Sequence, residues 1–195
     1  MKRKEYPEEG EFIVGTVTKV QNYGAFVTLD EYQDREGFVH IAEIASGWVK
    51  RIRNHIKEKQ KVVCKVMSVD EAKGHVDLSL KRVNEHQKRE KIKEWKNNKK
   101  AARLFEMLAD QINKTIDECW DEFGSDLVQQ YGSLYTAFEE AAYDPEILEN
   151  DGFSGYWVSE LNQIAKDNIA IQFVDIKGYL DIKSFEPDGV NHIRN

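Results

Sequence analysis

The chain has 195 residues, with 41% hydrophobic and 32% charged side chains and a formal net charge of −7. This length suffices for one or two domains with real cores. No run of 18 apolar residues indicates a membrane span, and the charged first fifteen residues do not read as a signal peptide. We therefore expect a cytoplasmic protein without membrane association. Cys64 and Cys119 lack a Cys or His at metal-ligand spacing, which argues against a zinc site or disulfide framework.

The charge divides unevenly along the chain. Residues 1–103 carry 23 Lys and Arg against 16 Asp and Glu, whereas residues 104–195 carry 5 against 19. Because attraction to phosphate depends on local patches, the acidic total does not exclude a nucleic-acid partner. The basic first half is therefore compatible with a nucleic-acid partner, and we expect the acidic half to face another partner or water.

Short runs that alternate apolar and polar residues fill roughly residues 12–82. Three glycines punctuate them: Gly24, Gly37 and Gly74. This pattern is typical of half-buried strands joined by tight turns and predicts a small β-barrel. It also places Tyr23, Phe26 and His40 where bases could stack, which suits single-stranded or looped RNA because every base has a π face.

These residues resemble the S1-type RNA-binding OB-fold. The resemblance rests on a Gly-x-Val-x-x-Val opening at 15–20, Tyr-Gly-Ala-Phe-Val at 23–27, Glu-Gly-Phe-Val-His-Ile at 36–41 and a closing Val-Asp-Leu-Ser at 76–79. It implies a five-stranded barrel with an RNA face. The residues at the family's RNA-binding positions are Tyr23, Phe26, His40, Asp70 and His75.

His75 departs from the family, which usually has Arg or Lys there, so this position mostly lacks charge at neutral pH. Structural interpretations remain open for three other positions. Phe26 fits the barrel core, His40 fits a turn histidine with satisfied hydrogen bonds, and Asp70 fits a cap for the turn to Gly74.

Residues 46–61, here called the basic insert, separate the third and fourth predicted strands. Its candidate RNA-binding residues are Trp48, Lys50, Arg51, Arg53 and Lys57. Apolar spacing places Trp48, Val49, Ile52 and Ile56 on one helical face, which we expect to pack down and anchor a mobile loop. Cations beside an aromatic ring suit phosphate contact with base stacking. A solvated connection with incidental charge is the alternative.

Helical periodicity begins near Asn84. Residues 85–100 are almost wholly polar and basic, so this helix buries little by itself. It either lies against the barrel and extends the basic surface or forms a solvated linker. An amphipathic stripe follows, with these apolar members: Leu104, Phe105, Leu108, Ile112 and Ile116.

Thr115 and Glu118 form a capping-box signature for a new helix. Four apolar residues after the cap lie at core spacing: Ile116, Trp120, Phe123 and Leu127. Gly132 interrupts the helices, and 154–165 is the last clear one. Residues 169–182 then alternate as two short strands, which are marginal without further cover.

The expected fold class is α+β in three parts. An S1-type OB-fold barrel of five strands occupies residues 1–84, an all-α helical domain occupies 85–174, and residues 175–195 are the truncated start of an α-β domain. This order resembles the alpha subunit of archaeal and eukaryotic translation initiation factor 2. Segments 43–46, 77–83 and 144–148, with Gly132 and the Ala137-Phe138 pair, carry that resemblance beyond the barrel.

The family implies a heterotrimeric GTP-binding factor that carries initiator methionyl-tRNA to the small ribosomal subunit. Its alpha subunit is not an enzyme and needs no cofactor; the barrel and helical domain reach toward initiator tRNA and ribosomal RNA, and the third domain docks on the GTPase gamma subunit. Ala45 occupies the position of the eukaryotic regulatory serine, which favours an archaeal-type protein. Ser46 is the nearest hydroxyl and stays a weak candidate phosphosite, because a phosphate there would lie beside Lys50 and Arg51.

Two other classes of function fit parts of the sequence. The barrel alone would fit an RNA-binding accessory subunit of a ribonuclease or exosome complex. A two-metal hydrolase is suggested only by acidic residues at 117–122, whose spacing is that of a solvated helix face. The sequence has no Gly-rich phosphate loop ending in Lys-Ser/Thr and no Ser-His-Asp arrangement with supporting context.

Overall fold

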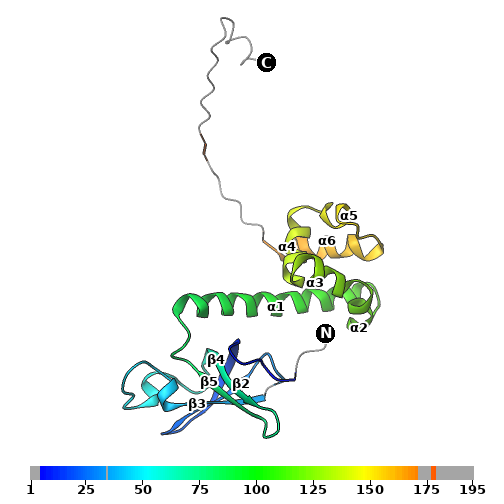
Figure 1. Cartoon of the computed structure of the whole chain (residues 1–195). Coiled ribbons are helices and arrows are strands. Elements are labelled where there is room, and N and C mark those ends of the chain that lie inside the picture. The colour runs from blue at the N-terminus through cyan, green and yellow to red at the C-terminus, as the bar shows by residue number, and fades with distance from the viewer. Residues whose placement is uncertain (1–4, 34, 171–176, 179–195) are drawn as a thin grey trace, which may run out of the picture.

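The structure, a computed structural model, describes residues 5–33, 35–170 and 177–178. Five strands close into a barrel in the order β1-β2-β3-β5-β4 (Figure 1). Their bounds are Phe12–Val20 for β1, Gly24–Leu29 for β2, Arg35–His40 for β3, Lys61–Asp70 for β4 and His75–Ser79 for β5. Neighbouring strands pair antiparallel except β3 and β5, which pair parallel. The expected five-stranded barrel followed by helices is confirmed, and its closure leaves no unpaired sheet edge.

The barrel core is built from the inward half of each alternating strand. Val17, Val27, Val39 and Leu78 are among its fully buried members. Cys64 belongs to the same core, and burial raises the pKa of its thiol to about 12. That thiol is therefore protonated and behaves as a small apolar side chain.

Two of the three punctuating glycines have another role than the one expected. Gly74 lies in the β4–β5 turn with φ +67°, a conformation that favours glycine. Gly24 and Gly37, however, lie inside β2 and β3. A Cβ on Gly24 would come 2.4 Å from Cζ of Phe38, and one on Gly37 would come 2.6 Å from Leu78. These glycines permit close packing within the sheet, a role that alternation does not reveal.

The basic insert is fastened to the barrel by three apolar residues. Val49, Ile52 and Ile56 are buried in the barrel core. Only Ile52–Asn54 form a helical turn within it, following the turn at Ile41–Glu43. Trp48 is 87% exposed, so its expected place on the packed face is wrong. With no helix at residues 46–51, the helical spacing does not apply to Trp48.

Helix α1 (Glu85–Gln111) is one continuous helix that joins the two parts of the molecule (Figure 1). Asn84 and Gln87 form a capping box at its start. Its first half packs on β1 and β4. Nζ of Lys61 lies 4.9 Å from the centre of the Trp95 ring, and Lys91 pairs with Glu31 at 3.2 Å. This half is therefore docked on the barrel, and the alternative of a solvated linker is excluded.

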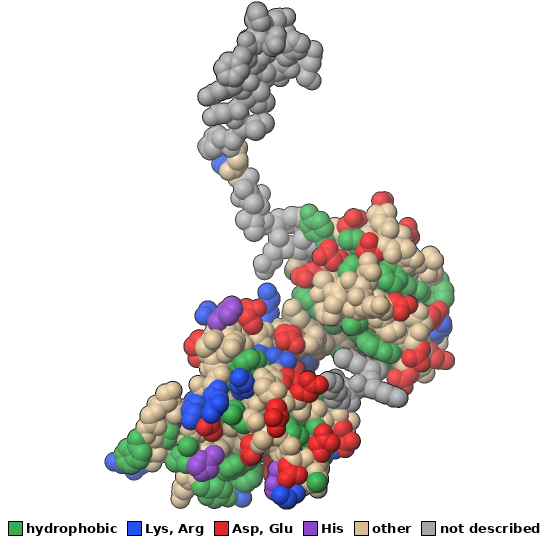
Figure 2. Space-filling model, in the orientation of Figure 1, with side chains coloured by type: hydrophobic (Ala, Val, Ile, Leu, Met, Phe, Trp, Pro, Cys, Tyr) green, Lys and Arg blue, Asp and Glu red, His purple; other side chains and the backbone are tan. Residues whose placement is uncertain are grey.

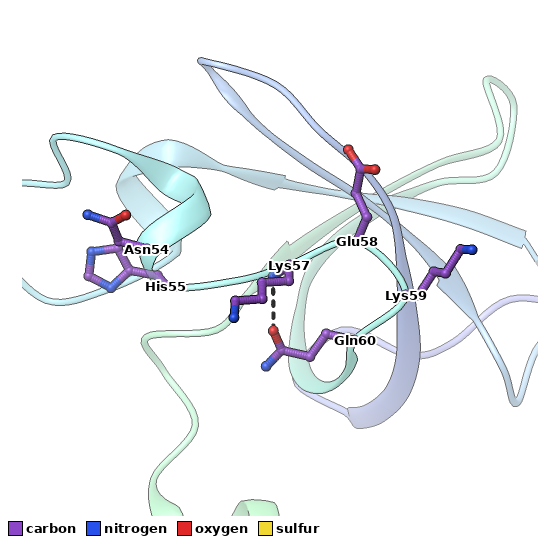
Figure 3. Close-up of a pocket in the computed structure, with 6 residues that line it drawn as sticks. All are labelled: Asn54, His55, Lys57, Glu58, Lys59 and Gln60. Atoms are coloured by element: carbon purple, nitrogen blue, oxygen red, sulfur yellow. Dashed lines mark hydrogen bonds between the residues drawn. The ribbon is translucent and has the colours of Figure 1, made fainter.

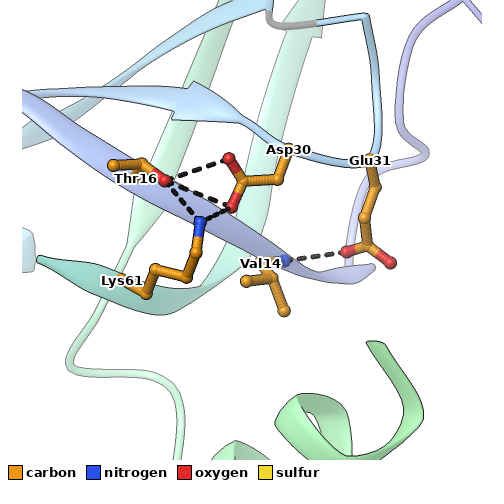
Figure 4. A network of polar contacts seen from close by, with 5 residues as sticks. All are labelled: Val14, Thr16, Asp30, Glu31 and Lys61. Carbon is orange, nitrogen blue, oxygen red and sulfur yellow. Dashed lines mark hydrogen bonds and ion pairs between the residues drawn. The ribbon is translucent and has the colours of Figure 1, made fainter. Parts of the chain in front are cut away.

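A network of polar contacts braces the barrel surface beneath α1 (Figure 4). Asp30 accepts hydrogen bonds from the Thr16 hydroxyl at 3.0 Å and from Lys61 at 2.7 Å. Oε2 of Glu31 accepts from the backbone N–H of Val14 at 2.8 Å. The connection between β2 and β3 is thus fixed to β1 and β4, and it presents a positioned Glu31 to the helix.

The second half of α1 belongs to the helical domain. The other helices are α2 (Ile116–Cys119), α3 (Ser125–Tyr131), α4 (Leu134–Tyr143), α5 (Ile147–Asn150) and α6 (Tyr156–Asn168), with a π-helical turn at Trp120–Gly124. Phe123 stacks on Trp157 with ring centres 4.1 Å apart, and both are buried. Leu108 and Leu161 are fully buried in the same core.

Ile116 is 46% exposed, which corrects its expected place in this core. The π-helical turn after α2 inserts an extra residue per turn and shifts the phase of the helix. Phe123 and Leu127 face the core, whereas Ile116 lies before the shift and faces solvent.

The two strands expected at 169–182 lie almost wholly outside the described residues. Within the described ranges, no helix is both long enough and apolar enough to cross a bilayer.

Candidate nucleic-acid interface

Three aromatic side chains form a cluster on the outer surface of β2 and β3. Phe26 lies between the buried Ala25 and Val27, so it faces outward and is not barrel core. Its ring centre lies 5.2 Å from that of Phe38, which lies 5.9 Å from that of Tyr23. Tyr23 is 55% exposed. These three rings are here called the aromatic face; Phe38 is tilted by 38° to Tyr23 and by 54° to Phe26, and each ring offers a separate surface on which a base can stack.

Phe38 was not among the expected site residues. The alternation of the strand could have identified it, because Phe38 lies between Gly37 and Val39, and when these two face the barrel interior, Phe38 faces outward. Phe38 rests against the bare backbone of Gly24 on the adjacent strand. The missing side chain at Gly24 therefore creates the space that holds Phe38 in the aromatic face.

His40 lies at the end of β3 beside the aromatic face. Its Nδ1 accepts a hydrogen bond from the backbone N–H of Ala42 at 3.2 Å, which caps the helical turn that follows. The backbone N–H of Ile41 donates to the carbonyl of Tyr23 at 2.9 Å. The structural interpretation of His40 is thus correct, while its side chain remains exposed at the end of β3.

Asp70 and His75 pair across the β4–β5 hairpin, at the other end of the same surface. In the parallel pairing of β3 with β5, Phe38 lies opposite Asp77. His40 comes two residues after Phe38 and His75 comes two residues before Asp77, so the two histidines lie in opposite directions along the strands. Four residues of strand separate them, or about 13 Å. The structure therefore does not gather the five expected barrel positions at one point.

Asp70 has a structural partner. It accepts a hydrogen bond from the backbone N–H of Lys73 at 3.1 Å and pairs with its ammonium group at 3.1 Å. The Lys73 side chain is the main cause of the lowered pKa of Asp70. Asp70 thus caps the turn to Gly74, as the alternative interpretation held.

Three cations of the basic insert line a hollow beside the aromatic face. Lys50, Arg51 and Arg53 line it together with Gln21 and Asn22, and its volume is about 430 Å³. Gln21 and Asn22 directly precede Tyr23, so the hollow lies next to the segment that leads into the exposed ring. A phosphate in the hollow and a base on Tyr23 would be neighbours along one strand of RNA.

Lys57 lies apart from these three cations. It lines a second hollow with Asn54, His55 and Lys59, whose side chains point in different directions (Figure 3). The backbone N–H of Lys57 donates to Gln60 Oε1 at 2.9 Å. The lining of this hollow includes two lysines and the acidic Glu58, whereas three cations and no carboxylate line the hollow beside Gln21 and Asn22, which is therefore the better anion site. Trp48 and Ser46 are exposed in the insert.

The helical domain has the opposite charge. Residues 104–170 carry two Lys and fifteen Asp and Glu. On the face shown in Figure 2, most Lys and Arg lie over the barrel end, mixed with acidic side chains, while acidic side chains predominate over the helical domain. Phosphate attraction is therefore confined to the barrel end of the molecule.

A closed barrel with an aromatic outer face and an adjoining group of cations defines an RNA-binding module of the S1 type. The family model described as S1 RNA binding domain matches residues 6–81. A second model, described as eukaryotic translation initiation factor 2 alpha subunit, matches residues 119–195. Together they cover the barrel and most of the helical domain.

Known relatives give the same result over nearly the whole chain. Translation initiation factor 2 subunit alpha of Methanobrevibacter smithii is 48% identical over 98% of this chain and 73% of its own length. The intact alpha subunit of aIF2 from Pyrococcus abyssi is similar in structure, with a TM-score of 0.74 and 42% identity over 98% of this chain and 73% of that one. The chain belongs to the family of translation initiation factor 2 alpha subunits.

A further solved structure concerns RNA. It is described as a complex of a/eIF2alpha, aDim2p and rRNA from Pyrococcus horikoshii OT3. That protein chain is 44% identical, with a TM-score of 0.70 over 86% of this chain and all of its own length.

Proposed function

We propose that this chain is the RNA-contacting alpha subunit of a heterotrimeric initiation factor that helps deliver initiator methionyl-tRNA to the small ribosomal subunit in the cytoplasm. The role needs no catalysis and no cofactor from this subunit. The hollow lined by the insert cations and by Gln21 and Asn22 carries the proposal, because it offers a phosphate site next to the segment that leads into the exposed Tyr23 ring. The relative in the rRNA complex supports RNA, including ribosomal RNA, as the partner.

The RNA surface in this proposal has two parts. Tyr23, Phe26 and Phe38 stack bases, with His40 at their border. The cations of the insert contact phosphates: Lys50, Arg51 and Arg53 at the hollow, and Lys57 beyond it. Trp48 is exposed enough to stack a further base. Asp70 and His75 contribute less, because Asp70 is already paired with Lys73 and His75 lies about 13 Å along the strands from His40.

The remainder of the chain has a different partner in this proposal. The acidic helical domain does not attract phosphate, and the third domain expected from residue 175 onward docks on the GTPase gamma subunit. The family match over 119–195 supports this division. It also disfavours an accessory subunit of a ribonuclease or exosome complex, because that interpretation rested on the barrel alone.

Fluorescence anisotropy with labelled initiator tRNA tests the RNA surface. The triple variant Lys50→Ala, Arg51→Ala and Arg53→Ala removes the cations of the hollow. Affinity falls as salt concentration rises, and each lost phosphate contact makes the plot of log affinity against log salt less steep by about 1. We therefore expect the slope of the triple variant to be smaller in magnitude by about 2 to 3. Affinity should fall correspondingly at low salt.

The matched control removes three exposed cations of α1 through Lys93→Ala, Lys96→Ala and Lys100→Ala. This helix docks on β1 and β4, whereas the aromatic face lies on β2 and β3. The control changes net charge equally and should affect tRNA binding much less. Equal losses for both triple variants would mean that the hollow is not the binding site.

A further inference from the structure

An unpaired carboxylate lies next to the aromatic face. Asp77 stands between the buried Val76 and Leu78 in β5, so its side chain faces outward. The parallel pairing of β3 with β5 sets it beside Phe38. Among the described residues, no Lys or Arg lies within ion-pair distance of Asp77, in contrast to Asp70 and its partner Lys73.

Asp77 has one polar side-chain neighbour. The hydroxyl of Ser68 on β4 donates to its Oδ2 at 2.9 Å. Ser68 pairs with Asp77 across the β4–β5 ladder. The hydroxyl orients the carboxylate and leaves Oδ1 to accept from another donor.

The strand registers place these groups in one row across the barrel. Lys19 of β1 pairs with Phe26, Phe26 pairs with Phe38, Phe38 pairs with Asp77, and Asp77 pairs with Ser68. Neighbouring strands lie about 4.8 Å apart, so the edge of a base stacked on Phe38 comes within reach of Asp77. The row thus offers a cation, two stacking rings and an acceptor in sequence.

A carboxylate beside a phosphate-binding surface has a cost, because it repels the RNA backbone. It accepts hydrogen bonds and donates none, so it favours a base edge that presents donors. Guanine presents N1–H and the N2 amino group side by side. Adenine and cytosine present one amino group each, and uracil presents one N–H between two carbonyl oxygens that face the carboxylate unfavourably.

We propose that Asp77, oriented by Ser68, selects an unpaired guanine stacked on Phe38. This inference rests on the proposed RNA-binding function and deepens it by naming the base. Asp77 is a specificity-determining residue in this arrangement, while the insert cations supply affinity that does not depend on sequence.

Octanucleotides of uridine with a single central guanosine, inosine or uridine test the selection at constant charge. Anisotropy titrations with the whole chain should show about tenfold tighter binding of the guanosine oligonucleotide than of the all-uridine one. Inosine lacks the N2 amino group and should fall between them. Asp77→Asn replaces one acceptor oxygen by a donor amide and should abolish the ranking.

Glu36→Gln is the matched control, because Glu36 is exposed on β3 two residues before Phe38 and the change in charge is the same. This variant should retain the preference for guanosine. Equal binding of all three oligonucleotides by the unaltered chain, or an unchanged ranking in Asp77→Asn, would overturn the inference and leave the proposed function intact. Failure of the chain to bind tRNA or any of these oligonucleotides would overturn both.

Discussion

Glu31 joins helix α1 to the barrel through Lys91. Oε1 of Glu31 lies 3.2 Å from Nζ of Lys91, while its Oε2 accepts from the backbone N–H of Val14. The two side chains are only 20% and 12% exposed. Burial lowers the pKa of Lys91, but the carboxylates of Glu31 and Glu94 outweigh it and the net pKa is raised. One carboxylate therefore connects a strand of the barrel with the helix that leads into the helical domain.

Lys91→Ala should destabilise the protein by about 1 to 3 kcal/mol. This lies between the costs of losing an exposed ion pair and of breaking a fully buried one. The loss leaves the half-buried Glu31 without its cation. Urea unfolding followed by circular dichroism measures the effect. Lys93→Ala, two residues away and exposed, should change stability by less than about 0.5 kcal/mol. Similar stabilities for both variants would show that the ion pair does not fasten the helix.

Stability should decrease at acid pH through Glu43. Lys81 and the Ser79 hydroxyl hold the pKa of this carboxyl below its usual value, and Oε1 lies 2.8 Å from Nζ of Lys81. A lowered folded-state pKa means that the stabilisation is present above the unfolded-state value near 4.5 and is lost as pH falls through the folded-state value. Unfolding free energies at pH 7 and at about pH 3 measure this loss. Glu43→Gln should be less stable than the parent at neutral pH and lose less on acidification; parallel pH curves would contradict the assignment.

The stacked pair of Phe123 and Trp157 predicts a strong effect in the helical domain. Phe123→Ala should cost about 3 to 5 kcal/mol, because it leaves a cavity against a buried indole. Thermal unfolding gives the stability, and near-ultraviolet circular dichroism reports the packing of the ring. Met107→Ala truncates a 40% exposed side chain of α1 and should have a small effect. A small effect of Phe123→Ala would mean that the domain repacks around the cavity.

The double variant Tyr23→Ala and Phe26→Ala should weaken RNA binding by about 1 to 3 kcal/mol per stacked base. Melting curves must first show that the barrel remains folded, because Phe26 also packs on Phe38. Tyr143→Ala removes a 69% exposed ring from the helical domain and should leave RNA affinity unchanged. A folded double variant with the parent's affinity would place the RNA surface elsewhere on the barrel.

Local patterns in the sequence determined the strands, the helix starts and most of the cores. Alternation assigns Val27 and Phe26 to opposite faces of the strand without knowledge of the fold, since successive side chains of a strand point to opposite faces. The cap at Asn84 and the break at Gly132 are likewise local, because each depends on a few neighbouring backbone groups. The family motifs are of the same kind and identify the barrel from short segments.

The tertiary structure decided which outward residues meet. Phe38 and Asp77 are far apart in the chain and become neighbours only through the parallel pairing of β3 and β5. Barrel closure sets that register through all five strands together, so no short segment contains it. The docking of Lys91 on Glu31 depends in the same way on where distant segments come to lie. The exposure of Trp48 and Ile116 has a local cause that apolar spacing did not reveal, namely the lack of a helix at residues 46–51 and the π-helical turn at Trp120–Gly124. Periodicity specifies the face of an element, whereas the partner of that face follows from the packing of the whole molecule.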